Sequence, residues 1–132
     1  MRPHTYRTVL LLAAAMLIPA LGSAQAPSLQ DVQVADIETM KEKFVGLAQA
    51  FLERGTLLFE EGQIDGAIAA LERALSADPQ LAPGHYRVGL CYMNRNRNED
   101  AQKHLKIFLE LAPNDPEADS AHRLLEVLRR SE

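Results

Sequence analysis

Apolar residues recur at helical spacing along most of the chain beyond residue 36. In residues 66–77, for example, they fall at i, i+1, i+4, i+7 and i+8 counted from Ala67, which is one face of an amphipathic helix. Applied along the chain, this periodicity predicts four helices, at about residues 49–61, 66–77, 83–94 and 99–111. The pattern therefore predicts an all-α protein.

Turn-forming residues divide these helices into two pairs. Gly62 and Asn96 each stand between the two helices of a pair, and both residue types suit the left-handed backbone that ends a helix. Pro79 and Pro113 end the second helix of each pair because proline cannot continue a helix. Asp65 is placed to cap the helix that follows Gly62.

Both flanks of the two pairs carry further helical patterns. Residues 116–132 begin with proline and acidic residues and continue with apolar residues at helical spacing, which predicts a C-terminal capping helix. Residues 36–47 predict an N-terminal helical extension, with Gly46 as a candidate break before the first pair. Residues 25–35 contain few apolar residues, and we expect them to be flexible.

The two helix pairs are copies of one unit. Four identities recur 34 positions apart: Gly55, Ala67, Leu71 and Pro79 in the first copy, and Gly89, Ala101, Leu105 and Pro113 in the second. A fixed period of this length indicates a supersecondary unit that is copied and stacked. Gly55 and Ala67 lie on the two helices of one pair, so we expect these small residues to let the helices approach closely.

The period, with glycine at the eighth place, alanine at the twentieth and proline at the thirty-second, resembles the tetratricopeptide repeat. In this register the repeats span residues 48–81 and 82–115, and Arg54 departs from the leucine that usually precedes the glycine. The resemblance implies a short right-handed solenoid. It also implies a protein that binds a peptide or partner helix and is not an enzyme.

In that family the first helix of each repeat lines a groove for the partner. The matching positions here are Leu52, Thr56, Phe59, Glu60, Tyr86, Arg87, Leu90, Met93 and Asn94. Leu52 and Thr56 stand where one subfamily carries the lysine and asparagine that clamp a C-terminal carboxylate, so that clamp is absent. Alternatively, the apolar members of this set pack against the flanking helices, which then cover the groove.

The N-terminus has the form of a secretory signal peptide. Arg2 and Arg7 precede an apolar stretch at residues 9–21, and small residues follow. We expect cleavage after Ala24 and export to the periplasm or the extracellular space. A bilayer-spanning helix needs about 20 residues, so a retained anchor is the less favoured alternative and no stable membrane insertion is expected after cleavage.

Charge and cysteine content narrow the class of partner. Residues 25–132 hold 12 basic and 18 acidic residues, a balance of −6 that argues against nucleic-acid binding. Cys91 is the single cysteine, so no disulfide forms within the chain. Burial of Cys91 within a helix is favoured over an intermolecular disulfide.

The sequence carries no recognisable catalytic, cofactor or metal motif. It has no glycine-rich phosphate loop, no Cys-x-x-Cys and no His-Glu-x-x-His, and His85, His104 and His122 have no helical metal-site spacing. We therefore expect a non-catalytic interaction module without cofactor. The alternatives are a self-associating structural protein and an accessory subunit of an envelope assembly or secretion complex.

Overall fold

The computed structural model describes residues 29–131 of the chain, which fold into helices without any strand. The helices are α2 (Leu29–Glu60), α3 (Ile64–Ala77), α4 (Ala82–Asn94), α5 (Asn98–Leu111) and α6 (Ala118–Arg130). The prediction of an all-α fold is confirmed. Contacts divide the chain into two units, residues 1–36 and residues 37–132, and the second unit holds α3 to α6 and most of α2.

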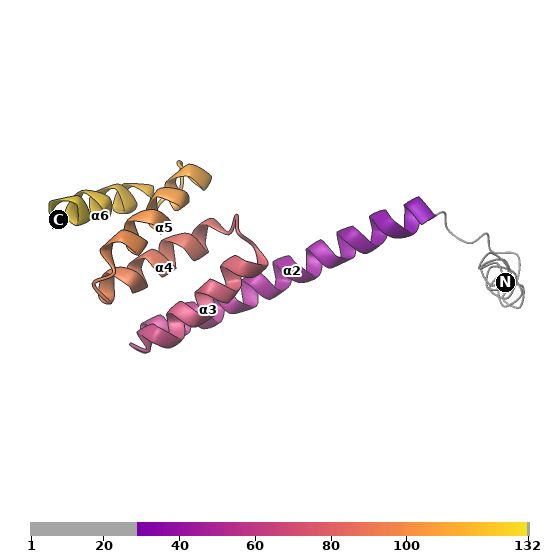
Figure 1. Ribbon diagram of the computed structural model, residues 1–132, viewed down its shortest axis with the longest axis horizontal. Helices are drawn as coiled ribbons and strands as arrows, with labels where there is room; N and C mark the ends of the chain where they lie inside the picture. Colours follow the sequence, from indigo (N-terminus) through magenta and orange to yellow (C-terminus); the bar gives the residue numbers. More distant parts are fainter. Residues whose placement is uncertain (1–28, 132) are drawn as a thin grey trace, which may run out of the picture. The chain divides into compact units, whose positions relative to one another are not determined.

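Successive helices of the second unit lie side by side (Figure 1). Tight turns join the helices of each pair, and both turns use left-handed backbone, with φ of 77° at Gly62 and 56° at Asn96. The closing hydrogen bonds are also repeated: the amide of Gln63 donates to the carbonyl of Leu58 at 2.8 Å, and the amide of Arg97 donates to that of Tyr92 at 2.9 Å. The local turn chemistry thus follows the 34-residue period that the sequence predicts.

Three local expectations are wrong. Gly46 does not interrupt α2, which runs unbroken for 32 residues. The same helix begins at Leu29, so residues 29–35 are helical rather than flexible; residues 25–28 and the predicted signal peptide lie outside the described residues. Asp65 does not cap α3, because the helix already begins at Ile64 and the Asp65 carboxylate instead accepts two hydrogen bonds from Arg95, at 2.6 and 2.8 Å.

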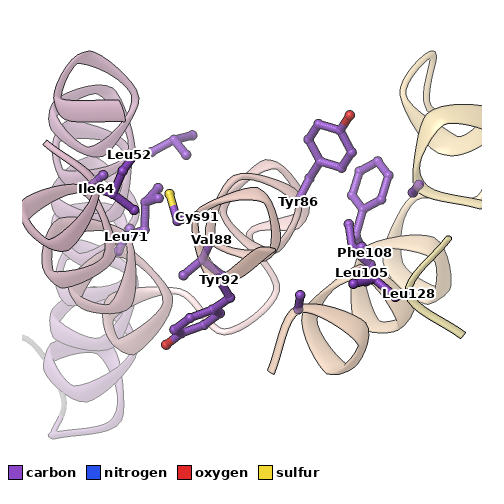
Figure 2. Close-up of a cluster of buried hydrophobic side chains, with 14 residues drawn as sticks. Leu52, Ile64, Leu71, Tyr86, Val88, Cys91, Tyr92, Leu105, Phe108 and Leu128 are labelled. Atoms are coloured by element: carbon purple, nitrogen blue, oxygen red, sulfur yellow. The ribbon is translucent and has the colours of Figure 1, made fainter. Parts of the chain in front are cut away.

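The core runs between the helices and takes its largest members from α3, α4 and α5 (Figure 2). The largest side chains that are fully buried are Phe108, Leu71, Leu105, Val88 and Cys91. Leu71 and Leu105 are the repeated leucines, so the repeat positions are core positions. Burial confirms the expected packing of Cys91 and raises the pKa of its thiol to about 11.

The repeated glycines allow the close packing that their positions predict. A Cβ atom at Gly55 would lie 2.6 Å from Cγ of Leu71, and one at Gly89 would lie 3.1 Å from Cγ of Leu105. The nearest neighbours are therefore the repeated leucines. The carbonyl of the repeated alanine Ala67 is farther away, 3.4 Å from the Cβ position at Gly55.

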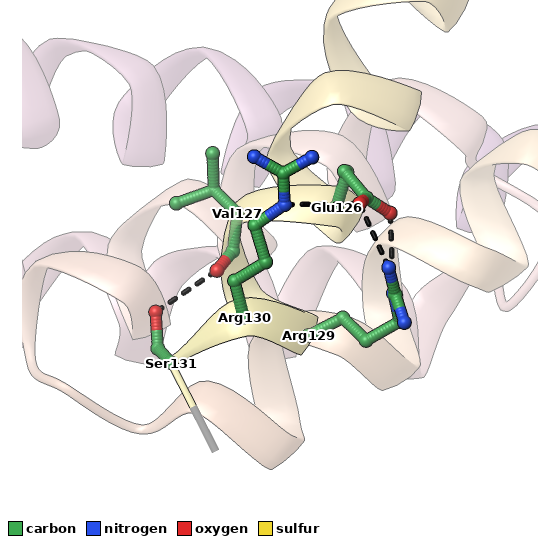
Figure 3. A network of polar contacts seen from close by, with 5 residues as sticks. All are labelled: Glu126, Val127, Arg129, Arg130 and Ser131. Atoms are coloured by element: carbon green, nitrogen blue, oxygen red, sulfur yellow. Dashed lines mark hydrogen bonds and ion pairs between the residues drawn. The ribbon is translucent and has the colours of Figure 1, made fainter.

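The C-terminal helix α6 packs on α5, and it buries Ala121 and Leu128. Its end is exposed and carries a small polar network, in which Arg129 and Arg130 donate to Glu126 (Figure 3). Hydrogen bonds from Arg129 and Arg130 lower the pKa of the Glu126 carboxyl, and the bond from Arg129 has the larger effect. Exposed ion pairs of this kind add little stability, so the buried residues hold α6 in place.

Candidate binding groove

A groove of about 550 Å³ lies between α2 and α4. It is lined by Gln49, Leu52, Glu53, Thr56, Leu57, Glu60, Pro83 and Arg87. The residues from α2 fall three, four and seven positions apart and therefore share one face of the helix. Pro83 and Arg87 lie four positions apart, one turn of α4.

The floor of the groove is largely apolar. Leu52 is 7 % exposed and belongs to the hydrophobic core, while Leu57 remains 59 % exposed at the side of the groove. The hydroxyl of Thr56 donates to the carbonyl of Leu52 at 2.9 Å within the same helix. That proton is therefore not free for a ligand, and Thr56 offers a methyl group and acceptor lone pairs.

Charged groups of both signs also line the groove. Glu53 and Glu60 are exposed on α2, and Arg87 is half-buried on α4. Within residues 34–131, where side chains are described, none of the three takes part in an ion pair. Their charges are not neutralised by near neighbours and can interact with an occupant of the groove.

A model of the tetratricopeptide repeat matches residues 58–125. The match spans more than half of the 132 residues. The chain belongs to the tetratricopeptide repeat family. No curated protein matches it. Tetratricopeptide repeats generally mediate protein–protein interaction, and the family is typically non-catalytic.

The structure gathers four of the nine residues that the tetratricopeptide register singles out. Leu52, Thr56, Glu60 and Arg87 line the groove together. The other five lie elsewhere: Phe59, Leu90 and Met93 are half-buried against the core, Tyr86 is buried, and Asn94 is exposed at the end of α4. Part of the expected groove surface is therefore covered by packing within the fold.

Tyr86 shows how this covering arises. Its ring centroid lies 5.0 Å from that of Phe108 on α5, and Figure 2 shows the two rings turned toward each other. Burial raises the pKa of the Tyr86 hydroxyl, the Glu117 charge raises it further, and a hydrogen bond with Ser120 opposes the shift. Tyr86 thus faces α5 and the start of α6.

Four lining residues escaped the sequence analysis: Gln49, Glu53, Leu57 and Pro83. Helical spacing could have found those on α2, because they lie three or four positions from the predicted Leu52, Thr56 and Glu60. Pro83 could be found in the same way, one turn before Arg87. These four residues can be recognised because they share a helix face with predicted groove residues, although they do not occupy the positions that the tetratricopeptide register singles out.

The turn between α4 and α5 is rich in arginine, but its guanidinium groups are engaged within the chain. Arg95 pairs with Asp65 at 2.6 Å, and Arg97 pairs with Asp100 at 2.8 Å. Arg97 also lies over the ring of Tyr92, 4.4 Å from its centroid. The guanidinium charges of this turn are therefore paired within the chain, unlike the charges that line the groove.

A partly buried polar cluster joins α3, α4 and α5. Nδ1 of His85 lies 2.9 Å from Nδ1 of His104, and Nε2 of His85 lies 2.9 Å from the carbonyl of Pro79. Because the carbonyl only accepts, His85 is assigned a proton on Nε2, and the Nδ1–H of His104 then donates to His85. The hydroxyl of Tyr92 donates to Glu72 beside the same rings.

This cluster joins the helices and offers no built metal site. In the part of the chain that the structure describes, no group of three histidine, cysteine, aspartate or glutamate side chains could hold a metal ion. In residues 29–131 there is also no helix long and apolar enough to cross a membrane.

Proposed function

We propose that this chain is a non-catalytic binding module that takes a peptide or a partner helix into the groove between α2 and α4. The observation that carries the proposal is the groove itself, which has an apolar floor at Leu52 and charges at Glu53, Glu60 and Arg87 that have no ion-pair partner among the described residues. Membership of a family whose repeats generally mediate protein–protein interaction supports it.

The lining suggests the chemistry of the partner. An apolar side chain would bury itself against Leu52 and Leu57, since removing apolar surface from water is the main source of affinity. A lysine or arginine of the partner would lie between Glu53 and Glu60, and an acceptor group would meet Arg87. The partner is thus an amphipathic segment with basic residues beside an apolar anchor.

Peptides selected on the immobilised chain from a random library test the proposal. We expect enrichment of apolar residues next to lysine or arginine. Leu57→Asp and Arg87→Glu should each weaken binding of a selected peptide about tenfold or more, which corresponds to about 1.4 kcal/mol. The measurement is the dissociation constant, by fluorescence anisotropy of the labelled peptide.

Val127→Asp is the matched control for Leu57→Asp. Val127 is 56 % exposed on α6, against 59 % for Leu57, and it does not line the groove. It should leave the dissociation constant unchanged. Equal loss of binding in both aspartate variants, or peptides without the expected pattern, would contradict the proposal.

We also propose export of the chain to the periplasm or the extracellular space, on the basis of the basic and apolar N-terminus. The intact mass of protein recovered from the producing cell's envelope and medium tests this. Cleavage after Ala24 predicts a mature chain that starts at Gln25. A chain that keeps residues 1–24 in the cytoplasm would contradict the proposal.

A further inference from the structure

A stripe of apolar residues on α2 lies outside the fold's own packing. Its members are Ile37, Met40, Phe44 and Leu47, which are 65 %, 55 %, 49 % and 47 % exposed. Together with Lys43, the last three line a hollow whose accessible surface is almost entirely apolar. We refer to these four residues as the α2 stripe.

The α2 stripe continues the helix face that α3 covers farther along. The next residue in its spacing is Phe51, which is half-buried against the core with Arg73 of α3 over its ring, 5.8 Å from the centroid. Helix α3 has 14 residues and is therefore about 21 Å long, whereas α2 has 32 residues and is about 48 Å long. Helix α3 is too short to cover the stripe.

The spacing within the stripe is that of a coiled coil. Steps of three, four and three residues separate its members, and a step of four leads to Phe51, so Ile37 and Phe44 occupy a positions and Met40 and Leu47 occupy d positions. Strict alternation of these steps gives the 3.5-residue period with which two helices supercoil about each other. Ile37 at an a position and Leu47 at a d position fit the preference of two-stranded coiled coils, whereas Met40 and Phe44 carry no such preference.

Charges beside the stripe select a second copy in parallel orientation. In a parallel, in-register pair, the g position of one helix meets the e position of the next heptad in the other, which brings Asp36 of each copy to Lys41 of the other. An antiparallel pair that overlaps the whole stripe would bring Lys41 against Lys41 and Lys43 against Lys43. The parallel pair gains two attractive contacts and avoids two repulsive ones.

We propose that the α2 stripe is a self-association surface, through which two copies of this chain form a parallel, in-register helix pair. The seam covers only about two heptads, so the association should be weak and depend on concentration. Two grooves would then act in one assembly, which would strengthen capture of a partner with repeated binding segments.

Cysteine cross-linking of the full chain tests the register. Met40→Cys places a thiol at a d position, where the two copies meet, while Glu42→Cys places one on the outer face of the same helix. We expect disulfide-linked dimers of Met40→Cys to form at least tenfold faster than those of Glu42→Cys under the same mild oxidant. The native thiol of Cys91 is fully buried and does not compete.

Light scattering on the same chain supplies a second readout. The intact mass of each sample identifies its N-terminal residue. The mass of the native chain should rise toward that of two copies with concentration, whereas Phe44→Glu should stay at one copy with unchanged helicity. Glu42→Lys should behave as the native chain. Equal linking rates for the two cysteine variants would overturn the proposal. Equal masses for the native chain and Phe44→Glu would also overturn it. So would disulfide formation only in a mixture of Met40→Cys with Phe44→Cys, because that result indicates an antiparallel pair, in which a d position meets an a position.

Discussion

At the scale of single residues, two glycines of α2 differ in what surrounds them. A Cβ atom at Gly55 would lie 2.6 Å from Cγ and 2.8 Å from Cδ2 of the buried Leu71, closer than such atoms normally approach. A Cβ atom at Gly46 would meet nothing within 4 Å. The same added methyl group should therefore have opposite effects at the two sites.

We predict that Gly55→Ala lowers the free energy of unfolding by about 1–3 kcal/mol through overpacking against Leu71. Gly46→Ala should raise it by about 0.5–1 kcal/mol because alanine is the better helix former. Urea denaturation of both variants checks this. Equal stability of the two would show that Leu71 moves aside without cost.

A second residue-scale effect concerns His104. Burial lowers the pKa of its imidazole from the ordinary value of 6.5. Repulsion from His85 and from Lys103 lowers it further, while Asp100 and Glu72 oppose the shift. The unfolded chain therefore binds a proton at a higher pH than the folded chain does. The stability that this residue contributes is present above pH 6.5 and is lost as the pH falls below it.

We predict that the free energy of unfolding of the native chain falls more steeply below pH 6.5 than that of His104→Phe, which keeps a ring but cannot titrate. Urea unfolding across this pH range measures both slopes. Identical slopes for the native chain and His104→Phe would refute the assignment.

At the scale of helices and turns, the sequence was informative where the structure is decided locally. The left-handed turns at Gly62 and Asn96 follow from the residue types themselves, and so do the helix ends before Pro79 and Pro113. The start of α3 could not be predicted in this way, because Asp65 does not cap it. The partner of Asp65 is Arg95, 30 positions later, and no local pattern reveals that pair.

The predicted helix break at Gly46 was wrong for a different reason. Glycine inside a helix costs only about 1 kcal/mol relative to alanine. The hydrogen bonds and packing of a 32-residue helix outweigh that cost, so Gly46 alone does not end it. A glycine without a following proline or a second turn residue is therefore weak evidence for a helix break.

The attachment of α6 gives a prediction at this scale. Leu128 is 3 % exposed within the core, whereas its neighbour Val127 is 56 % exposed. Leu128→Ala should lower the free energy of unfolding by about 2–5 kcal/mol because it leaves a cavity. Val127→Ala should change it by no more than about 0.5 kcal/mol. Similar losses for the two variants in urea denaturation would contradict the packing of α6.

At the scale of the whole molecule, the family register singles out four of the eight residues that line the groove. It pointed to Leu52, Thr56, Glu60 and Arg87 because one helix face can be followed from sequence spacing. It also pointed to Tyr86, which packs against Phe108, 22 positions later on α5. Which side of α4 remains open depends on how α5 and α6 pack, and that is a tertiary property.

The same distinction separates the groove from the α2 stripe. The groove joins residues of two helices that the fold brings together, whereas the stripe is visible as a heptad pattern on one helix. From the sequence alone, residues 36–47 predict only an N-terminal helical extension. The exposure of the stripe depends on the length of α3, which is too short to cover it.

Photo-cross-linking in the native cell tests whether the groove between α2 and α4 holds a protein partner. A benzophenone amino acid would replace Leu57 in the groove or, as the matched control, Val127 on α6, and irradiated products would be identified by mass spectrometry. We expect a discrete adduct from position 57 that is absent from position 127 and is lost when Arg87→Glu is added. No adduct from position 57, or the same adduct from both positions, would contradict it.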